Sequence, residues 1–259
     1  MKIPSISLWG VYSVWHRHAR VYQRTWLVNF LPPITEPIVY LIAFGLGLTP
    51  LVGEVIYNGQ PVTYLEFIAP GMIALGVLFQ SFFEGAFGSF IRLNFQRTWH
   101  ALLTAPLSFG DVFVGDWLWA TTKGMITGTL TGVVAILWGI YSPLSLLIAL
   151  PFMLLGSLLF ACMGLIVAGA ANKVDHINIP IFGFVIPMFT LCGTYFPRET
   201  LPGTLRAIAN VLPLASLVDL LRFPMGLPQW WWADVLWLVV LTLISAALAV
   251  RMIRPKLIH

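Results

Sequence analysis

The sequence predicts an all-α integral membrane protein with six transmembrane helices. Of its 259 residues, 59% are hydrophobic and 9% are charged, whereas a soluble globular domain has about 45–50% apolar and about 25% charged residues. Apolar runs longer than ~18 residues recur along the chain, and each is long enough to cross a bilayer as a helix. The net charge of +4 therefore does not indicate a nucleic-acid partner, because in a membrane protein the location of the basic residues matters more than their sum.

The first segment, residues 5–24, predicts an amphipathic helix that lies in the membrane interface. One face carries Leu8, Tyr12, Trp15, Ala19 and Tyr22, and the other carries His16, Arg17, Arg20, Gln23 and Arg24. Rings would face lipid and cations would face headgroups. The alternative is an ordinary amphipathic helix packed on protein. The segment lacks the charged, apolar and small-residue regions of a cleavable signal peptide in order.

The six spans are expected at 26–48, 64–91, 109–139, 144–171, 177–196 and 229–252. Pro32, Pro33 and Pro37 make the start of the first span irregular. Ser108 and Asp111 have capping-box spacing, so the third span begins there. Tyr141-Ser142-Pro143 predicts a tight turn between the third and fourth spans. With no internal repeat and no interdomain linker, residues 1–259 form one membrane domain.

The positive residues orient this arrangement. One side holds Lys2, Arg17, Arg20, Arg24, Arg92, Arg97, Lys173, Arg251, Arg254 and Lys256; the other holds Arg198, Arg206 and Arg222. The positive-inside rule then places both termini in the cytoplasm and segments 49–63 and 197–228 outside. This arrangement predicts a multi-pass membrane protein with both termini on the cytoplasmic side.

The external segment 197–228 contains two short apolar stripes separated by Pro213. The first is Leu201, Leu205, Ile208 and Leu212, and the second is Leu214, Leu217, Val218 and Leu221. Each piece has about 8–11 residues, too short to cross a ~30 Å hydrocarbon core. We expect two re-entrant helices that dip into the outer membrane face and return, shielded by protein.

Glu84 is the ionisable residue with the least ordinary surroundings, inside the second span among Phe83, Phe87 and other phenylalanines. A charge at the centre of a membrane helix costs about 2.5–3.5 kcal/mol on insertion scales, so it should face protein or water. It either lines a substrate path or pairs with a cation at a helix interface. The alternative places it near the cytoplasmic end, reaching headgroups or Lys123. Glu36 has the same ambiguity, nearer the interface.

The third span contains Gly124, Gly128 and Gly132, two consecutive GxxxG steps that predict a close helix-packing face rather than a site. Asp116 and Lys123 are seven residues apart on the same span, so they cannot touch, and we expect each to find partners on the second span.

Catalytic motifs are missing from the sequence. It has no P-loop, GxSxG, HExxH or CxxC, and His16 and His18 diverge on a helix, so no catalytic or metal site is expected. Cys162 and Cys192 are expected to act as small hydrophobic residues.

Two stretches together resemble the membrane subunit of type-2 ABC exporters, in particular the nodulation-factor (NodJ-type) lipooligosaccharide permeases. They are FEGAFGSFIRLNFQRTWHALLTAPLSFGDVFVGDWLWATTKG at 83–124 and FTLCGTYFPRETLPGTLRAIANVLPLASLVDLLR at 189–222. The chain departs from the family pattern at Arg198-Glu199 and at Cys192, both near the outer exit.

The resemblance implies a homodimer paired with two copies of a separate ABC ATPase, which would bind ATP and Mg; this chain would bind no cofactor. It implies that segment 95–104 is a coupling helix docked into that ATPase, and that the N-terminal helix is a gate at the cytoplasmic mouth. The coupling residues would be Phe95, Gln96, Arg97, Trp99, His100, Leu102 and Leu103. Candidates for the substrate path are Glu84, Phe83, Phe87 and Tyr195.

The sequence therefore favours the permease of an ATP-driven exporter of an amphipathic lipooligosaccharide- or glycolipid-like substrate. The first alternative is an exporter of hydrophobic drugs or antibiotics. The second is a proton-coupled secondary transporter that uses Glu84 and Glu36; such transporters often contain an internal repeat, and none is seen. The third is a membrane-embedded enzyme, for which the spans contain no nucleophile–base pair.

Overall fold

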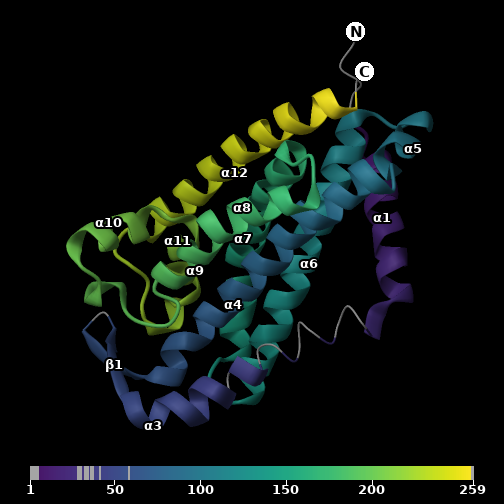
Figure 1. The fold of residues 1–259 in the computed structure, drawn as a ribbon. Coiled ribbons are helices and arrows are strands. Elements are labelled where there is room, and N and C mark those ends of the chain that lie inside the picture. The colour runs from purple at the N-terminus through teal and green to yellow at the C-terminus, as the bar shows by residue number, and fades with distance from the viewer. Residues whose placement is uncertain are drawn as a thin grey trace.

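The computed structural model describes residues 6–27, 31, 35, 38–40, 42–57 and 59–257. Long helices form a bundle, with one small β-hairpin at one end (Figure 1). Five stretches of the described residues are long and apolar enough to cross a membrane: Tyr64–Phe95, Phe109–Leu137, Pro143–Ala170, Val174–Leu191 and Trp231–Lys256. The predicted fold class, an all-α multi-span membrane protein, is confirmed.

The first expected span, 26–48, and Glu36 lie partly or wholly outside the described residues. The described part includes a π-helical stretch, η1 (Ala43–Leu48), and the short helix α3 (Thr49–Val52). Helix α3 leads into an antiparallel hairpin of β1 (Glu54–Tyr57) and β2 (Gln60–Thr63). The hairpin lies within segment 49–63, which the sequence predicts to lie outside the membrane; its strands were not predicted.

The second span is continuous over Tyr64–Phe95 and extends past residue 91. It consists of α4 (Tyr64–Phe83) and two π-helical stretches, η2 (Glu84–Gly88) and η3 (Ile91–Phe95). A capping box starts α4: the Thr63 hydroxyl accepts from Glu66 N, and the Glu66 carboxylate accepts from Thr63 N. Within helices, π-helical turns are frequent at functional sites.

The next two spans are α6 (Phe109–Leu137) and α7 (Pro143–Ala170). The predicted cap of α6 is confirmed, since Ser108 Oγ accepts from Asp111 N and Asp111 Oδ2 accepts from Ser108 N. Ser142 caps α7, whose first residue is Pro143.

The remaining elements complete the bundle and its far end. The fifth span contains η4 (Val174–Ile177), α8 (Asn178–Pro180), η5 (Ile181–Val185) and α9 (Ile186–Leu191). After it come η6 (Arg198–Thr200), α10 (Gly203–Val211), α11 (Pro213–Leu221) and η7 (Phe223–Met225). The last span contains α12 (Trp231–Ile253) and η8 (Arg254–Lys256).

Helices α10 and α11 are the two short helices expected in segment 197–228. They meet at an 81° bend, the geometry of a broken span or a re-entrant loop. All nine residues of α11 are buried. Arg222, the residue that follows, is 1% exposed, and its guanidinium donates to the carbonyl oxygens of Phe67 and Gly193. This buried cation therefore links the end of α11 to α4 and to the loop that follows α9.

Helix α1 (Leu8–Arg24) packs on α6 at the end of the bundle that carries helix α5 (Thr98–Thr104) (Figure 1). The face against α6 consists of Val11, Val14, His18 and Tyr22, while Leu8 is 90% exposed. The alternative of a helix packed on protein thus holds for this face. The expectation that Tyr22 faces lipid is wrong, because its ring is buried beside Trp119.

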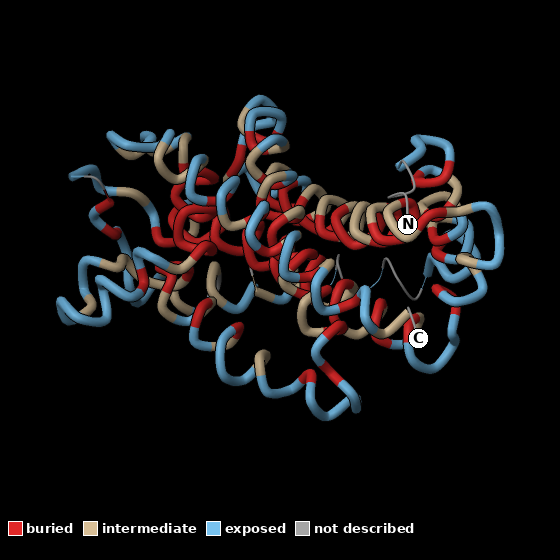
Figure 2. Tube along the Cα trace, turned by 90° about the horizontal axis from the view of Figure 1, so that it is seen from above, coloured by how far each residue is buried: buried red, intermediate tan, exposed pale blue. Residues whose placement is uncertain are grey.

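Close packing explains how the spans assemble (Figure 2 shows the buried residues as a strip along the bundle). A Cβ added at Gly128 would lie 2.6 Å from Val77 of α4 and 2.6 Å from Met153 of α7. One at Gly124 would lie 1.8 Å from Ser81 Oγ, and one at Gly132 would lie 2.4 Å from a Leu146 methyl group. The atoms that approach the three glycines belong to α4 and α7, so these positions pack closely against neighbouring helices of the bundle.

Candidate functional site

The segment that resembles a coupling helix turns sharply before α5. Arg97 has φ 49°, a left-handed backbone conformation that is uncommon for a residue with a side chain. This turn ends η3 at Phe95 and starts α5 at Thr98, so the helix begins later than the expected residue 95.

The exposed side of this segment has a mixed apolar and basic surface. Phe95 is 67% exposed, and Gln96, Arg97 and His100 are exposed as well. Leu102 and Leu103 are half-buried against the chain's own core.

Trp99 lies differently from the expectation that it docks into another protein. It is 1% exposed, and its ring centroid lies 6.4 Å from that of Phe109, the first residue of α6. Leu93 and Val14 belong to the same buried cluster. The indole therefore anchors α5 to the start of α6, inside the buried cluster that also contains Leu93 of η3 and Val14 of α1.

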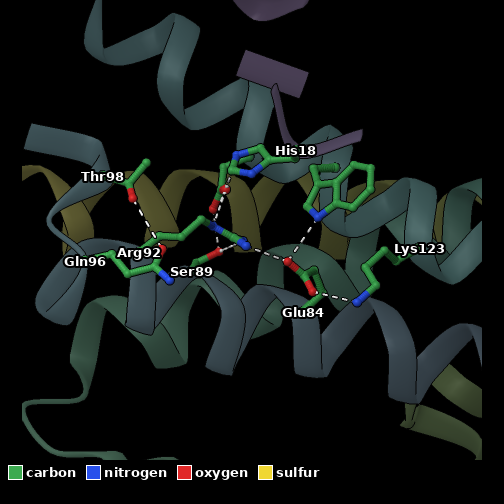
Figure 3. Close-up of polar contacts among 9 residues, drawn as sticks. His18, Glu84, Ser89, Arg92, Gln96, Thr98 and Lys123 are labelled. Carbon is green, nitrogen blue, oxygen red and sulfur yellow. Dashed lines mark hydrogen bonds and ion pairs between the residues drawn. The ribbon is translucent and has the colours of Figure 1, made fainter. Parts of the chain in front are cut away.

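A cluster of buried charges lies beside this segment and joins three helical elements (Figure 3). We use the term charge cluster for His18, Glu84, Ser89, Arg92, Asp116, Trp119 and Lys123. Glu84 accepts from three donors: Arg92 Nη1 at 2.6 Å, Lys123 Nζ at 2.9 Å and Trp119 Nε1 at 3.1 Å. These contacts join η2 to η3 and to α6.

Asp116 is the second acid of the charge cluster and is fully buried. Its Oδ1 lies 2.8 Å from Arg92 Nε, at ion-pair distance but without the angle of a hydrogen bond, and 3.1 Å from His18 Nε2. Its Oδ2 accepts from the Ser89 hydroxyl, which also accepts from Arg92 Nη2. Asp116 therefore holds side chains from α1, the second span and α6 together.

Within the cluster, the carboxylates of Glu84 and Asp116 face the cations of Arg92 and Lys123. Buried charges persist only when they are paired and hydrogen-bonded. On the α1 side, Lys123 Nζ lies 5.5 Å from the centroid of the Tyr22 ring. Burial, with the Glu84 carboxylate as a second cause, raises the pKa of Tyr22 above its ordinary value of 10.0, so this phenol stays protonated at neutral pH.

Glu84 was expected to line a substrate path, to pair with a cation at a helix interface, or to reach headgroups or Lys123. Glu84 pairs with cations at a helix interface, and one of them is the expected Lys123. The prediction that Asp116 and Lys123 find partners on the second span is confirmed by Arg92 and Glu84. The sequence placed Arg92 on the cytoplasmic side and predicted no ion pair for it or for His18. The signal that could have identified these two residues was Asp116, an acidic residue on an apolar span that needs a buried partner.

The other substrate-path candidates lie in a separate group, which we call the aromatic row. It consists of Tyr40, Phe44, Tyr195, Phe189, Phe79, Phe83 and Phe87, in that order of contact. Successive ring centroids are 5.4–6.3 Å apart, within the range of favourable aromatic pairs. All seven rings are partly exposed. The row thus gives a continuous aromatic face shared by the first, second and fifth spans.

The described residues offer little for metal or redox chemistry. Within them, no group of three or more His, Cys, Asp or Glu side chains could hold a metal ion. Cys162 and Cys192 are both buried and free of disulfide bonds.

The amino-acid sequence of this chain matches one family of known proteins. The family described as "ABC-2 type transporter" matches residues 10–226. "Nodulation protein J" of Rhizobium meliloti (strain 1021) is 35% identical over 214 residues, which cover 83% of this chain and 80% of the relative. "Nodulation protein J" of Rhizobium leguminosarum bv. viciae is 37% identical over 210 residues, covering 81% and 80%.

A more distant relative carries a transport name. "Inner membrane transport permease YadH" of Escherichia coli (strain K12) is 24% identical over 211 residues, covering 82% of this chain and 80% of the relative. The resemblance seen in segments 83–124 and 189–222 therefore extends over most of the chain, which belongs to the ABC-2 type transporter family as a nodulation-type membrane permease.

Proposed function

We propose that this chain is the permease subunit of an ATP-driven exporter in a bacterial inner membrane, with both termini in the cytoplasm. Two copies of the chain would pair with two copies of a separate ABC ATPase, which holds ATP and Mg²⁺. The observation that carries the proposal is an exposed surface at the start of α5. Phe95 at the end of η3, Arg97 in the turn and His100 on α5 are exposed, while Trp99 fixes α5 to α6.

The contacts of α5 explain how force on this surface would reach the spans. η3 precedes α5 directly through Arg97, and α6 follows it after a short turn. Glu84 and Arg92 tie the second span to α6 through Lys123 and Asp116. Because buried ion pairs are costly to break one partner at a time, the second and third spans would shift together when α5 is pushed.

The aromatic row supports an amphipathic substrate of the lipooligosaccharide or glycolipid class. Sugar rings and acyl chains both pack on aromatic faces, so a row of partly exposed rings along three spans suits a substrate with both parts. The resemblance of segments 83–124 and 189–222 to nodulation-factor lipooligosaccharide permeases supports the same class, and two similar proteins carry the name "Nodulation protein J". In this arrangement Phe83, Phe87 and Tyr195 contact substrate, whereas Glu84 organises the neighbouring helices.

Glu84 argues against the proton-coupled alternative. A proton carrier must release its partners to accept a proton, and Glu84 is held by two cations and an indole. An exporter of hydrophobic drugs would use the same aromatic row. The two substrate classes are therefore distinguished by a transport assay with both kinds of substrate.

The test is transport in inverted vesicles that contain the permease with its ABC ATPase. We expect ATP-dependent uptake of a fluorescent lipooligosaccharide, and none with an ATPase carrying an inactive Walker motif. Uptake driven by a proton gradient without ATP would overturn the ATP-driven assignment. Uptake of a hydrophobic dye but of no glycolipid would overturn the substrate class and leave the ATP-driven assignment intact.

A further inference from the structure

Arg222 is a buried cation at the end of the bundle that carries the β-hairpin. It is 1% exposed, and in the part of the chain that the structure describes it forms no ion pair. Its guanidinium carbon lies 3.8 Å from the ring centroid of Phe67 and 5.2 Å from that of Tyr57. Because a buried cation without an acidic partner costs free energy, its place in a membrane protein points to a role beyond packing.

The guanidinium of Arg222 holds a loop that follows the fifth span. We use the term outer loop for residues 192–197, which lie between α9 and η6. Arg222 Nη2 donates to Gly193 O of this loop at 2.6 Å and to Phe67 O of α4 at 3.1 Å. One side chain therefore joins the end of α11, the second span and the outer loop.

Helix α4 contacts the outer loop at two further points. The Tyr64 hydroxyl donates to Tyr195 O at 3.2 Å. A Cβ added at Gly71 would lie 3.0 Å from Thr194 O, so the two backbones approach closely there. Three successive residues of the outer loop, 193–195, are thus held by Arg222 and by α4.

The outer loop carries the ring that joins two parts of the aromatic row. The ring centroid of Tyr195 lies 5.5 Å from that of Phe44 and 6.3 Å from that of Phe189. Phe44 belongs to the first expected span and Phe189 to the fifth span. The backbone position of the outer loop therefore decides whether the row is continuous between these spans.

We propose that Arg222 and Tyr64 are positioning residues for transport, which fix the outer loop so that Tyr195 completes the binding surface of the aromatic row. The proposal rests on the proposed function, in which Tyr195 contacts substrate. Arg222 and Tyr64 act on substrate only through the outer loop. Loosening the loop therefore weakens the binding of a lipooligosaccharide, because the aromatic surface that receives it is interrupted.

Two native cysteines report on the outer loop independently of transport. Cys192 lies in the loop and Cys162 lies in α7. Both side chains are 0% exposed and free of disulfide bonds, so both are shielded from a water-soluble maleimide. Release of the outer loop should expose Cys192 and leave Cys162 protected.

The test uses Tyr64→Phe, Arg222→Lys and Arg222→Gln in the full chain, assembled with the ATPase in proteoliposomes. Arg206→Gln is the matched control, because Arg206 lies on α10 with an exposed side chain. The rate of N-ethylmaleimide modification of Cys192 and Cys162 is measured by mass spectrometry. ATP-dependent transport is measured over a range of concentrations of a fluorescent lipooligosaccharide.

We expect Cys192 to react several-fold faster in Tyr64→Phe and Arg222→Gln, and to stay slow in Arg206→Gln. Cys162 should stay slow in every variant. In Tyr64→Phe and Arg222→Gln, the substrate concentration for half-maximal transport should rise several-fold, by a larger factor than the maximal rate falls. Arg222→Lys keeps the charge and one group of donors, so both of its values should lie between those of the unchanged protein and Arg222→Gln.

Three results would overturn the proposal. The first is slow modification of Cys192 in both Tyr64→Phe and Arg222→Gln. The second is equal acceleration of Cys192 and Cys162, which means that these variants loosen the whole bundle. The third is fast modification of Cys192 with an unchanged half-saturating concentration, which means that the position of Tyr195 does not affect binding.

Failure of the proposed function gives a different result. If the unchanged complex shows no ATP-dependent transport, the proposed function is wrong and the role of the outer loop in transport is wrong with it. If the unchanged complex transports and the variants match it, only the positioning role is wrong. Because Tyr64→Phe removes a single oxygen atom, the test does not depend on the folding of Arg222→Gln.

Discussion

Arg92 reaches back along its own helical segment to Glu84, eight residues earlier, and places Nη1 2.6 Å from Oε1. In a regular α-helix such positions are about 12 Å apart along the axis. Gly88, midway between them, leaves the space that this contact needs, since a Cβ there would lie 2.6 Å from Glu84 Oε1 and 3.1 Å from Arg92 Nη1. The ion pair therefore depends on a glycine that does not itself carry charge.

Replacing Gly88 by alanine should disrupt the ion pair. Overpacking of this kind costs about 1–3 kcal/mol, and we expect a lower thermal melting temperature in detergent. Gly183→Ala is the matched control, because nothing lies within 4 Å of the position of its added Cβ. Equal melting temperatures for both variants would show that the space at Gly88 is not needed.

Glu84→Gln should destabilise the protein, because it removes the carboxylate shared by Arg92 and Lys123. Removing one partner of a buried ion pair costs about 3–5 kcal/mol, and the measurement is the free energy of unfolding. Glu54→Gln, at an exposed hairpin position, should leave this energy unchanged. A Glu84→Gln variant with normal stability and transport would instead support a surface role for Glu84.

Phe95→Ala and Trp99→Ala should separate docking from anchoring. Phe95 is 67% exposed, so its loss should weaken pull-down of the ATPase and leave the melting temperature unchanged. Trp99 is 1% exposed, and truncating such a ring costs about 3–5 kcal/mol, so this variant should melt earlier. The docking assignment is wrong if Phe95→Ala binds and stimulates the ATPase normally.

Phe83→Ala and Phe189→Ala should lower substrate transport more than they lower ATP hydrolysis, because both rings belong to the aromatic row. Phe182→Ala is the control, because Phe182 lies on the fifth span, as Phe189 does, but is not part of the aromatic row. Its side chain is 67% exposed. The measurement is the ratio of transported substrate to ATP hydrolysed in vesicles. Similar ratios for all three variants would remove the row from the substrate path.

The sequence alone determined the class of this protein, because long apolar runs leave few options in a membrane. It predicted the start of α6 from Ser108 and Asp111, whose reciprocal hydrogen bonds are local. It also predicted the packing face of Gly124, Gly128 and Gly132, since small residues at this spacing admit a close neighbour. Such features depend on residues near one another in the chain.

Only the tertiary structure decided how the charged side chains are used. His18 and Asp116 are 98 positions apart in the numbering and meet through the packing of α1 on α6, which no local pattern encodes. Trp99 looked like a docking residue because it lies in an amphipathic segment, yet the Arg97 turn directs it into its own protomer. Burial and pairing are properties of the assembled helices, so they became visible only when the spans were in place.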